Sequence, residues 1–135
     1  MKLAIREYWQ NLKTEYKTNY KVSIFSDYNV LKEYIECFKI YLNGLLHEHS
    51  HDLNIVCALA TVEQVLRHEE NSIQLLEEFL RKYIEELSDT DKARVYTNLA
   101  FYYNDEGNIK EYDYLSAAVK LNSPYIETYR GLALY

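Results

Sequence analysis

Glycine and proline are scarce in this chain of 135 residues, which contains three glycines and one proline. All-β folds need frequent turn residues, and dinucleotide-binding folds need glycine-rich loops, so the composition argues against both classes. It favours helices, because glycine and proline are the residues that helix interiors tolerate least. A chain of this length supports one hydrophobic core, and we therefore predict a single all-α domain over residues 1–135.

Long apolar runs and cysteine motifs are also missing. No apolar stretch approaches the roughly 18 to 20 residues of a membrane span, and the amino terminus lacks the apolar segment of a signal peptide. We therefore expect a cytoplasmic protein with no membrane contact. Cys37 and Cys57 follow no metal or redox spacing and lie within apolar helical patterns, so we expect both to be buried free thiols.

The net charge of −6 argues against nucleic-acid binding, since that affinity depends on clustered Lys and Arg. The charge is unevenly distributed. Residues 1–21 carry five basic and two acidic side chains, a net charge of +3, which leaves −9 for the rest of the chain. Such a contrast can steer self-association, although solvated surfaces commonly show one.

The spacing of apolar residues predicts seven helices arranged as antiparallel hairpins. The first two fall within 1–48 and are separated from the third by a polar loop at 47–52. Helices three and four form a segment at 51–87, and helices five and six occupy 90–122. A seventh helix is expected over 124–135.

Helix starts and stops are predicted from capping residues. Ser26 or Asp27 can cap the second helix. Asn71 with Gln74 matches a capping box, and Ser88 to Asp91 supplies the next stop and start. The remaining signals are Gly107 as a turn glycine, the Asn108–Glu111 capping box, and Ser123–Pro124, whose proline suits the first position of a helix.

A short pattern recurs near the carboxyl terminus. Tyr96, Leu99 and Ala100 are echoed 33 residues later by Tyr129, Leu132 and Ala133. Together with a second aromatic residue at Tyr103, the turn glycine and Pro124 between the two copies, this pattern resembles the tetratricopeptide repeat. That repeat is a helical hairpin, usually of 34 residues, that stacks into a superhelix with a concave binding face.

The resemblance implies a short α-solenoid of about seven helices. Residues 90–122 would form one repeat, with a one-residue deletion between Gly107 and Ala118, and 124–135 would be the first helix of a further repeat or a capping helix. Residues 51–87 would be a degenerate hairpin, and 1–48 a helical pair that caps the stack.

The resemblance also implies a function, which is non-enzymatic binding of a peptide or protein segment. The expected groove positions are Arg94, Thr97, Asn98, Phe101 and Asn104. The Asn98 amide can donate to and accept from a ligand backbone. Arg94 and Arg130 can hold a carboxylate by charge-assisted hydrogen bonds. No cofactor and no catalytic motif is expected.

Three alternatives stay open. The cluster from His47 to Asp52 has metal-ligating residue types, but its spacing is weak and a solvated turn is the simpler interpretation. The repeat could instead be the sensing portion of a bacterial peptide-pheromone receptor. Finally, the protein could be a structural module that self-associates through the apolar edge of its last helix, which consists of Tyr125, Tyr129, Leu132 and Tyr135. Such an edge rarely stays bare, so either the chain continues in a longer protein, or the helix is itself a cap, or a second copy forms a homodimer there.

Overall fold

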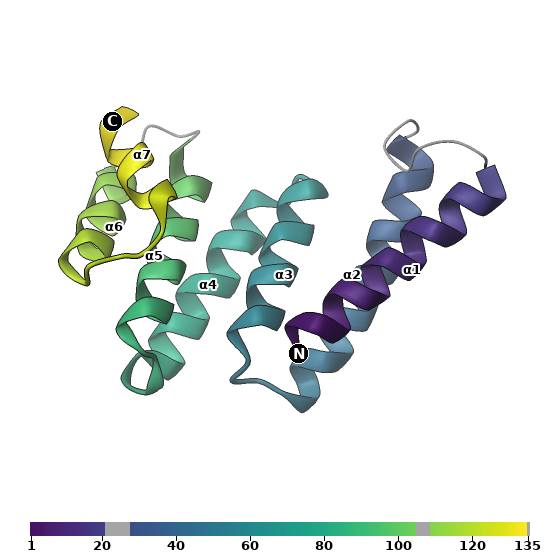
Figure 1. Ribbon diagram of the computed structural model, residues 1–135, viewed down its shortest axis with the longest axis horizontal. Helices are drawn as coiled ribbons and strands as arrows, with labels where there is room; N and C mark the ends of the chain where they lie inside the picture. Colours follow the sequence, from purple (N-terminus) through teal and green to yellow (C-terminus); the bar gives the residue numbers. More distant parts are fainter. Residues whose placement is uncertain (21–27, 105–108, 135) are drawn as a thin grey trace. The chain divides into compact units, whose positions relative to one another are not determined.

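The protein is described by a computed structural model that places residues 1–20, 28–104 and 109–134 (Figure 1). Every regular element in these ranges is helical, which confirms the all-α class. No helix among the described residues is long and apolar enough to cross a membrane. The elements are α1 (Lys2–Tyr20), α2 (Tyr28–Glu48), α3 (Leu53–Val65), α4 (Glu69–Tyr83), the 3₁₀ turn η1 (Ile84–Glu86), α5 (Asp89–Asn104), α6 (Ile109–Lys120) and α7 (Ile126–Leu134).

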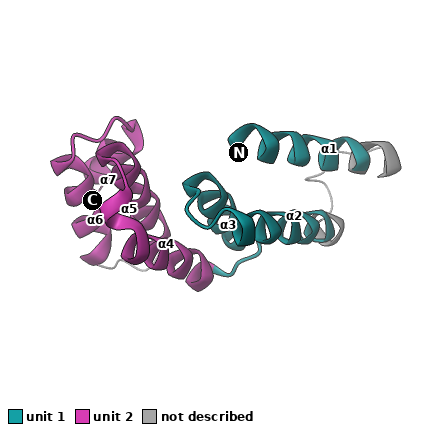
Figure 2. Cartoon of the chain, turned by 90° about the horizontal axis from the view of Figure 1, so that it is seen from below, with its two compact units in different colours: residues 1–68 teal, residues 69–135 magenta. Residues whose placement is uncertain are grey.

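The helices form two compact units, Met1–His68 and Glu69–Tyr135 (Figure 2). The boundary passes between α3 and α4 and therefore divides the segment 51–87 that the sequence predicts as a hairpin. The single cooperative domain over 1–135 stays a prediction.

In the first unit, α2 packs against both α1 and α3. The α1 contact is aromatic, since the rings of Tyr8 and Tyr41 stack with centroids 3.8 Å apart, and Trp9 packs on Phe38 at 5.2 Å. Leu42 on α2 is completely buried, as is Ile55 on α3. Burial of each such side chain contributes about 1.5 to 3 kcal/mol, so these contacts stabilise this unit.

The connection between α2 and α3 is shorter than predicted. The sequence predicts a loop over 47–52, but α2 continues through Glu48, and the backbone N–H of His49 still donates to the Leu45 carbonyl at 2.8 Å. No glycine or proline occurs at residues 47–49, so the helix continues for two residues past Leu46 before it ends. Asp52 then caps α3, where its carboxylate accepts from the Asn54 backbone N–H at 2.9 Å.

The predicted N-cap at Asn71 is wrong, because α4 begins two residues earlier at Glu69. The helix break lies instead at Arg67, whose φ of 64° is left-handed. The N–H groups of Arg67 and His68 donate to the carbonyls of Gln64 and Glu63, the hydrogen-bond pattern of a Schellman motif. Glycine usually occupies such a position, so this arginine gave no sequence signal.

In the second unit, α5 packs against α4, α6 and α7. Its start is confirmed at Ser88, whose hydroxyl accepts from the Asp91 backbone N–H at 3.1 Å. Leu99 and Ala100 are buried as predicted, and so are Leu115 and Ala118 on the facing side of α6. The small alanine side chains allow the two helices to approach closely.

The turn between α6 and α7 is a second Schellman motif. Asn122 has a φ of 57°, and the N–H groups of Asn122 and Ser123 donate to the carbonyls of Val119 and Ala118. The next helix begins at Ile126, two residues after Pro124, so the proline precedes the helix and does not open it. Gly107 and the capping residue Asn108 lie outside the described residues.

The prediction for the cysteines is half wrong, because Cys57 is buried and Cys37 is exposed. Cys37 lies on a side of α2 that also carries Ile40, which is 73 % exposed. The apolar stripe on α2 is wide, and the sequence does not tell which part of it faces α1 and α3.

Candidate peptide-binding face

Three of the predicted site residues form one stripe on α5. Arg94, Asn98 and Phe101 are spaced by four and three residues, which places them on the same side of a helix. Arg94 and Asn98 are partly exposed, and Phe101 is 53 % exposed. We call these three residues the α5 face. It combines a cation, an amide and an aromatic ring on a helix whose other sides are packed.

Arg94 and Asn98 each interact with other groups in the chain. A ligand would therefore compete with, or add to, contacts that the face already makes. The guanidinium has five N–H donors and the amide has two donors and an acceptor, so each can serve more than one partner.

Thr97 does not lie open on the α5 face, because its side chain is 4 % exposed. Its hydroxyl lies 2.7 Å from that of Thr128 on α7. Thr128 is completely buried, and its hydroxyl also lies 2.8 Å from that of Ser123. These three hydroxyls form a buried chain that fixes α7 beside α5, so Thr97 contributes to packing at the border of the face.

The other two predicted residues are separate from the stripe. Asn104 is exposed in the last turn of α5. Arg130 is exposed on α7, two residues beyond Thr128. Residues two apart on a helix point in nearly opposite directions, so the side of α7 that meets α5 at Thr128 does not carry Arg130. The packing of α7 on α5 therefore does not support the prediction that Arg94 and Arg130 hold one carboxylate together.

A cluster of tyrosines around Glu77 was missed by the sequence analysis. Glu77 on α4 lies four residues before Arg81, a spacing typical of an exposed ion pair, but Arg81 pairs with Glu78 at 3.4 Å. The Glu77 carboxylate instead accepts hydrogen bonds from the Tyr103 hydroxyl on α5 and, at 3.3 Å, from the Tyr114 hydroxyl on α6. One carboxylate thus joins three helices.

Tyr114 of this cluster is held as a neutral phenol. The Tyr114 ring stacks on Tyr96 and Tyr103 with centroids 5.8 and 6.0 Å away. Burial raises the pKa of Tyr114 to about 12, and the charge of Glu77 and its hydrogen bond act in the same direction. A phenol with this pKa is a hydrogen-bond donor at neutral pH and a poor general base, so the cluster is suited to holding helices together.

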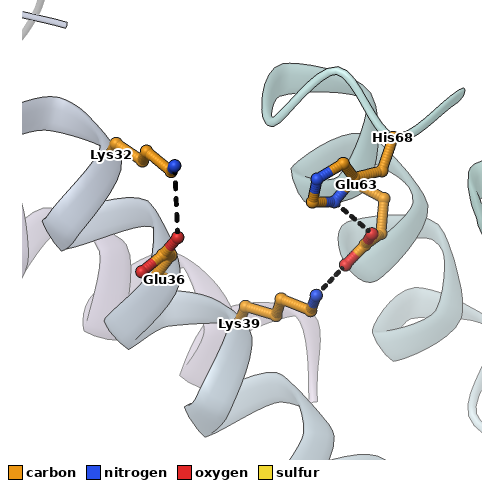
Figure 3. Close-up of polar contacts among 5 residues, drawn as sticks. All are labelled: Lys32, Glu36, Lys39, Glu63 and His68. Atoms are coloured by element: carbon orange, nitrogen blue, oxygen red, sulfur yellow. Dashed lines mark hydrogen bonds and ion pairs between the residues drawn. The ribbon is translucent and has the colours of Figure 1, made fainter. Parts of the chain in front are cut away.

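A second buried carboxylate lies in the first unit (Figure 3). Glu63 on α3 is 3 % exposed, and its two oxygens are 2.5 Å from Lys39 Nζ and 3.1 Å from His68 Nδ1. A buried carboxylate is costly unless it is paired, and here α2 and the end of α3 each supply a partner. This cluster connects the two helices.

Among the described residues, no group of three or more His, Cys, Asp and Glu side chains is arranged to hold a metal ion. The predicted polar cluster at 47–52 is divided between the end of α2, a turn and the cap of α3, and the Asp52 carboxylate is engaged in that cap. Comparison of the chain with protein-family models, with curated protein sequences and with solved structures gave no match.

Proposed function

We propose that the chain is a tetratricopeptide-like scaffold that holds an extended peptide or protein segment against the α5 face. Two aspects of the second unit support the repeat interpretation. Successive helices from α4 to α7 pack in chain order, and α7 also packs on α5, as the first helix of a following repeat would. The residues at the small and leucine positions of the repeat pattern, Ala100 and Leu99, are buried.

The observation that carries the binding proposal is the exposure of Phe101 in line with Asn98 and Arg94. A single exposed aromatic residue is common on protein surfaces. Here the ring shares its stripe with an amide that can bond a peptide backbone and with a guanidinium that can bond a carboxylate or a carbonyl. A bound segment would place an apolar side chain on Phe101 and its backbone along Asn98.

The proposal excludes the cluster around Glu77 and that around Glu63 from ligand binding. In both clusters the carboxylate oxygens are already bonded to donors from neighbouring helices. A ligand that displaced those donors would separate packed helices, whereas a ligand on the α5 face leaves the packing unchanged.

The test begins with selection of binders from a library of random linear peptides on the immobilised protein. Affinities of the enriched peptides are then measured for the parent chain and for Phe101→Ala and Asn98→Ala. We expect each substitution to weaken binding about tenfold, because a lost hydrogen bond or apolar contact corresponds to roughly 1.4 kcal/mol. Helical circular dichroism should not change.

Ile109→Ala is the matched control, since Ile109 is 63 % exposed on α6 and lies off the α5 face. Binding that falls with Phe101→Ala and Asn98→Ala and persists with Ile109→Ala supports the proposal. Selected peptides that bind both α5 variants as tightly as the parent chain would contradict it.

A further inference from the structure

The outer side of α7 presents an exposed stripe with an internal symmetry. Ile126 is 59 % exposed and Tyr129 is 45 % exposed, and both Arg130 and Ala133 are exposed as well. The intervals between these four residues are three, one and three, so the stripe has the same spacing when it is read in either direction. We call these four residues the α7 stripe.

This stripe differs from the apolar edge that the sequence predicts. Tyr125 and Leu132 of that edge are partly covered, and Tyr135 lies outside the described residues. Tyr129 alone belongs to both sets. The helix is rotated so that Thr128 is buried and Gly131 lies against Leu115.

The rotation of α7 is fixed from the inside of the unit. Thr128 is held by the hydroxyls of Thr97 and Ser123, and the Tyr129 hydroxyl donates to the Ser123 carbonyl at 2.8 Å. Since the inner side of the helix is tied at several points, the stripe is presented in a single orientation. A preorganised surface loses little entropy when it binds a partner.

We propose that the α7 stripe binds the same stripe of a second copy of this chain, with the two helices antiparallel about a two-fold axis. If the axis passes midway between Tyr129 and Arg130, each Tyr129 ring faces the guanidinium of Arg130 in the other copy. Ile126 then faces Ala133 of the other copy. The spacing therefore makes the stripe self-complementary, which an isologous contact requires, and it adds two cation–π pairs.

The charge distribution agrees with a second copy as the occupant. The second unit has thirteen acidic and seven basic side chains, so it carries the whole net charge of −6 and would be repelled by another copy at most surfaces. In α7 the charges balance, with one acid at Glu127 and one base at Arg130. Two acidic units can meet along this helix without placing a net negative surface against another.

The contact between the two stripes is small, so the dimer should be weak. A helix of nine residues is about 13 Å long, so two such stripes bury less than the roughly 800 Å² per partner of a standard stable interface. We expect a reversible dimer whose population rises with protein concentration. This inference does not depend on the α5 face, which is carried by another helix.

Sedimentation equilibrium of the full chain over a range of concentrations tests the dimer. Ile126→Asp should raise the dimer dissociation constant at least about tenfold, because it places two carboxylates in an apolar contact. Ile40→Asp is the matched control, since Ile40 is more exposed and lies on α2 of the other unit. A chain that is monomeric at every concentration, or a dimer that Ile126→Asp leaves intact, would overturn the proposal.

Cross-linking tests the register. In a Cys37→Ser background, chains with Ile126→Cys are mixed with chains with Ala133→Cys and treated with a short bifunctional maleimide. The antiparallel register predicts that the mixed pair cross-links faster than either variant with itself. Faster cross-linking of Ile126→Cys with itself would contradict that register. Asn98→Ala should leave both readouts unchanged, so the dimer and the peptide-binding proposal can fail separately.

Discussion

The hydroxyl oxygens of Thr97 and Thr128 lie 2.7 Å apart in the buried contact between α5 and α7. The two residues are 31 positions apart in sequence and come from helices that the repeat pattern predicts to be equivalent. This contact defines both proposed surfaces. It covers Thr97 at the border of the α5 face, and it places the α7 stripe on the opposite, exposed side of α7.

Thr128→Val tests how much this contact contributes. Valine has the shape of threonine but leaves the buried hydroxyls of Thr97 and Ser123 without their shared partner. We expect the free energy of unfolding to fall by about 1 to 3 kcal/mol, the cost of leaving buried polar groups unsatisfied. Urea denaturation measures it, with the exposed Thr90→Val as the control in the same unit. Equal effects of both substitutions would contradict a special role for Thr128.

The Lys39–Glu63 pair offers a comparison between two ion pairs of the first unit (Figure 3). Lys39→Met removes the cation that pairs with the buried Glu63 carboxylate and leaves His68 as a partner. We expect a loss of about 1 to 3 kcal/mol, less than for a fully buried pair because the Lys39 side chain is 32 % exposed. Lys32→Met removes the exposed Lys32–Glu36 pair, whose charged atoms are 4.0 Å apart, and should cost at most about 0.5 kcal/mol.

Similar losses for the two lysine substitutions, measured by urea denaturation, would show that the burial of Glu63 does not matter to stability. A larger loss for Lys32→Met would reverse the order that the geometry predicts.

Tyr114 predicts a dependence of stability on alkaline pH. Its pKa is raised from 10.0 to about 12 in the folded chain, so the folded state holds the phenolic proton more tightly than the unfolded state. The stabilisation is fully present below pH 10 and is lost as the pH rises toward 12, because the unfolded phenol ionises first. Urea denaturation at a series of pH values should show a steeper alkaline decline for the parent chain than for Tyr114→Phe. Parallel declines would contradict the assignment.

Gly131 and Gly44 should respond to alanine in opposite directions. A Cβ at Gly131 would lie 3.0 Å from Leu115 Cδ2, whereas nothing lies within 4 Å of one at Gly44. Alanine is favoured over glycine in a helix by about 1 kcal/mol, so Gly44→Ala should stabilise the chain by up to that amount. Leu115 is 1 % exposed and has little room to move, so Gly131→Ala should destabilise the chain. Thermal melting of both variants tests the opposite signs.

The helices and the centre of the second unit could be predicted because apolar periodicity reports burial directly. Leu99 and Ala100 are examples. The helix end at Arg67 could not be predicted, since glycine usually occupies a left-handed position at a helix end and an arginine gives no such signal. The contacts of Glu77 could not be predicted from the sequence either. Its spacing from Arg81 suggests a pair on a helix surface, and only the packing of α5 and α6 brings two tyrosine hydroxyls to its carboxylate.

In the candidate site, too, some features could be predicted from the sequence and others depend on tertiary packing. The resemblance to the tetratricopeptide repeat implied that Arg94, Asn98 and Phe101 share one side of a helix, and they lie four and three residues apart on α5. The sequence could not reveal that α7 covers Thr97, because residues three and four apart share a face whether or not a neighbour packs at its border. Which side of α7 faces outward likewise depends on Thr128 and Gly131, which face inward. Neither residue is part of the apolar pattern, so the sequence does not predict this orientation.

The central claim is that the α5 face receives a bound segment. Backbone amide NMR spectra of the chain, recorded during titration with a peptide selected for binding, test it most directly. We predict that the largest shift changes fall at Arg94, Asn98 and Phe101. Changes confined to α7 or to the first unit, with the α5 face unaltered at saturation, would contradict the claim.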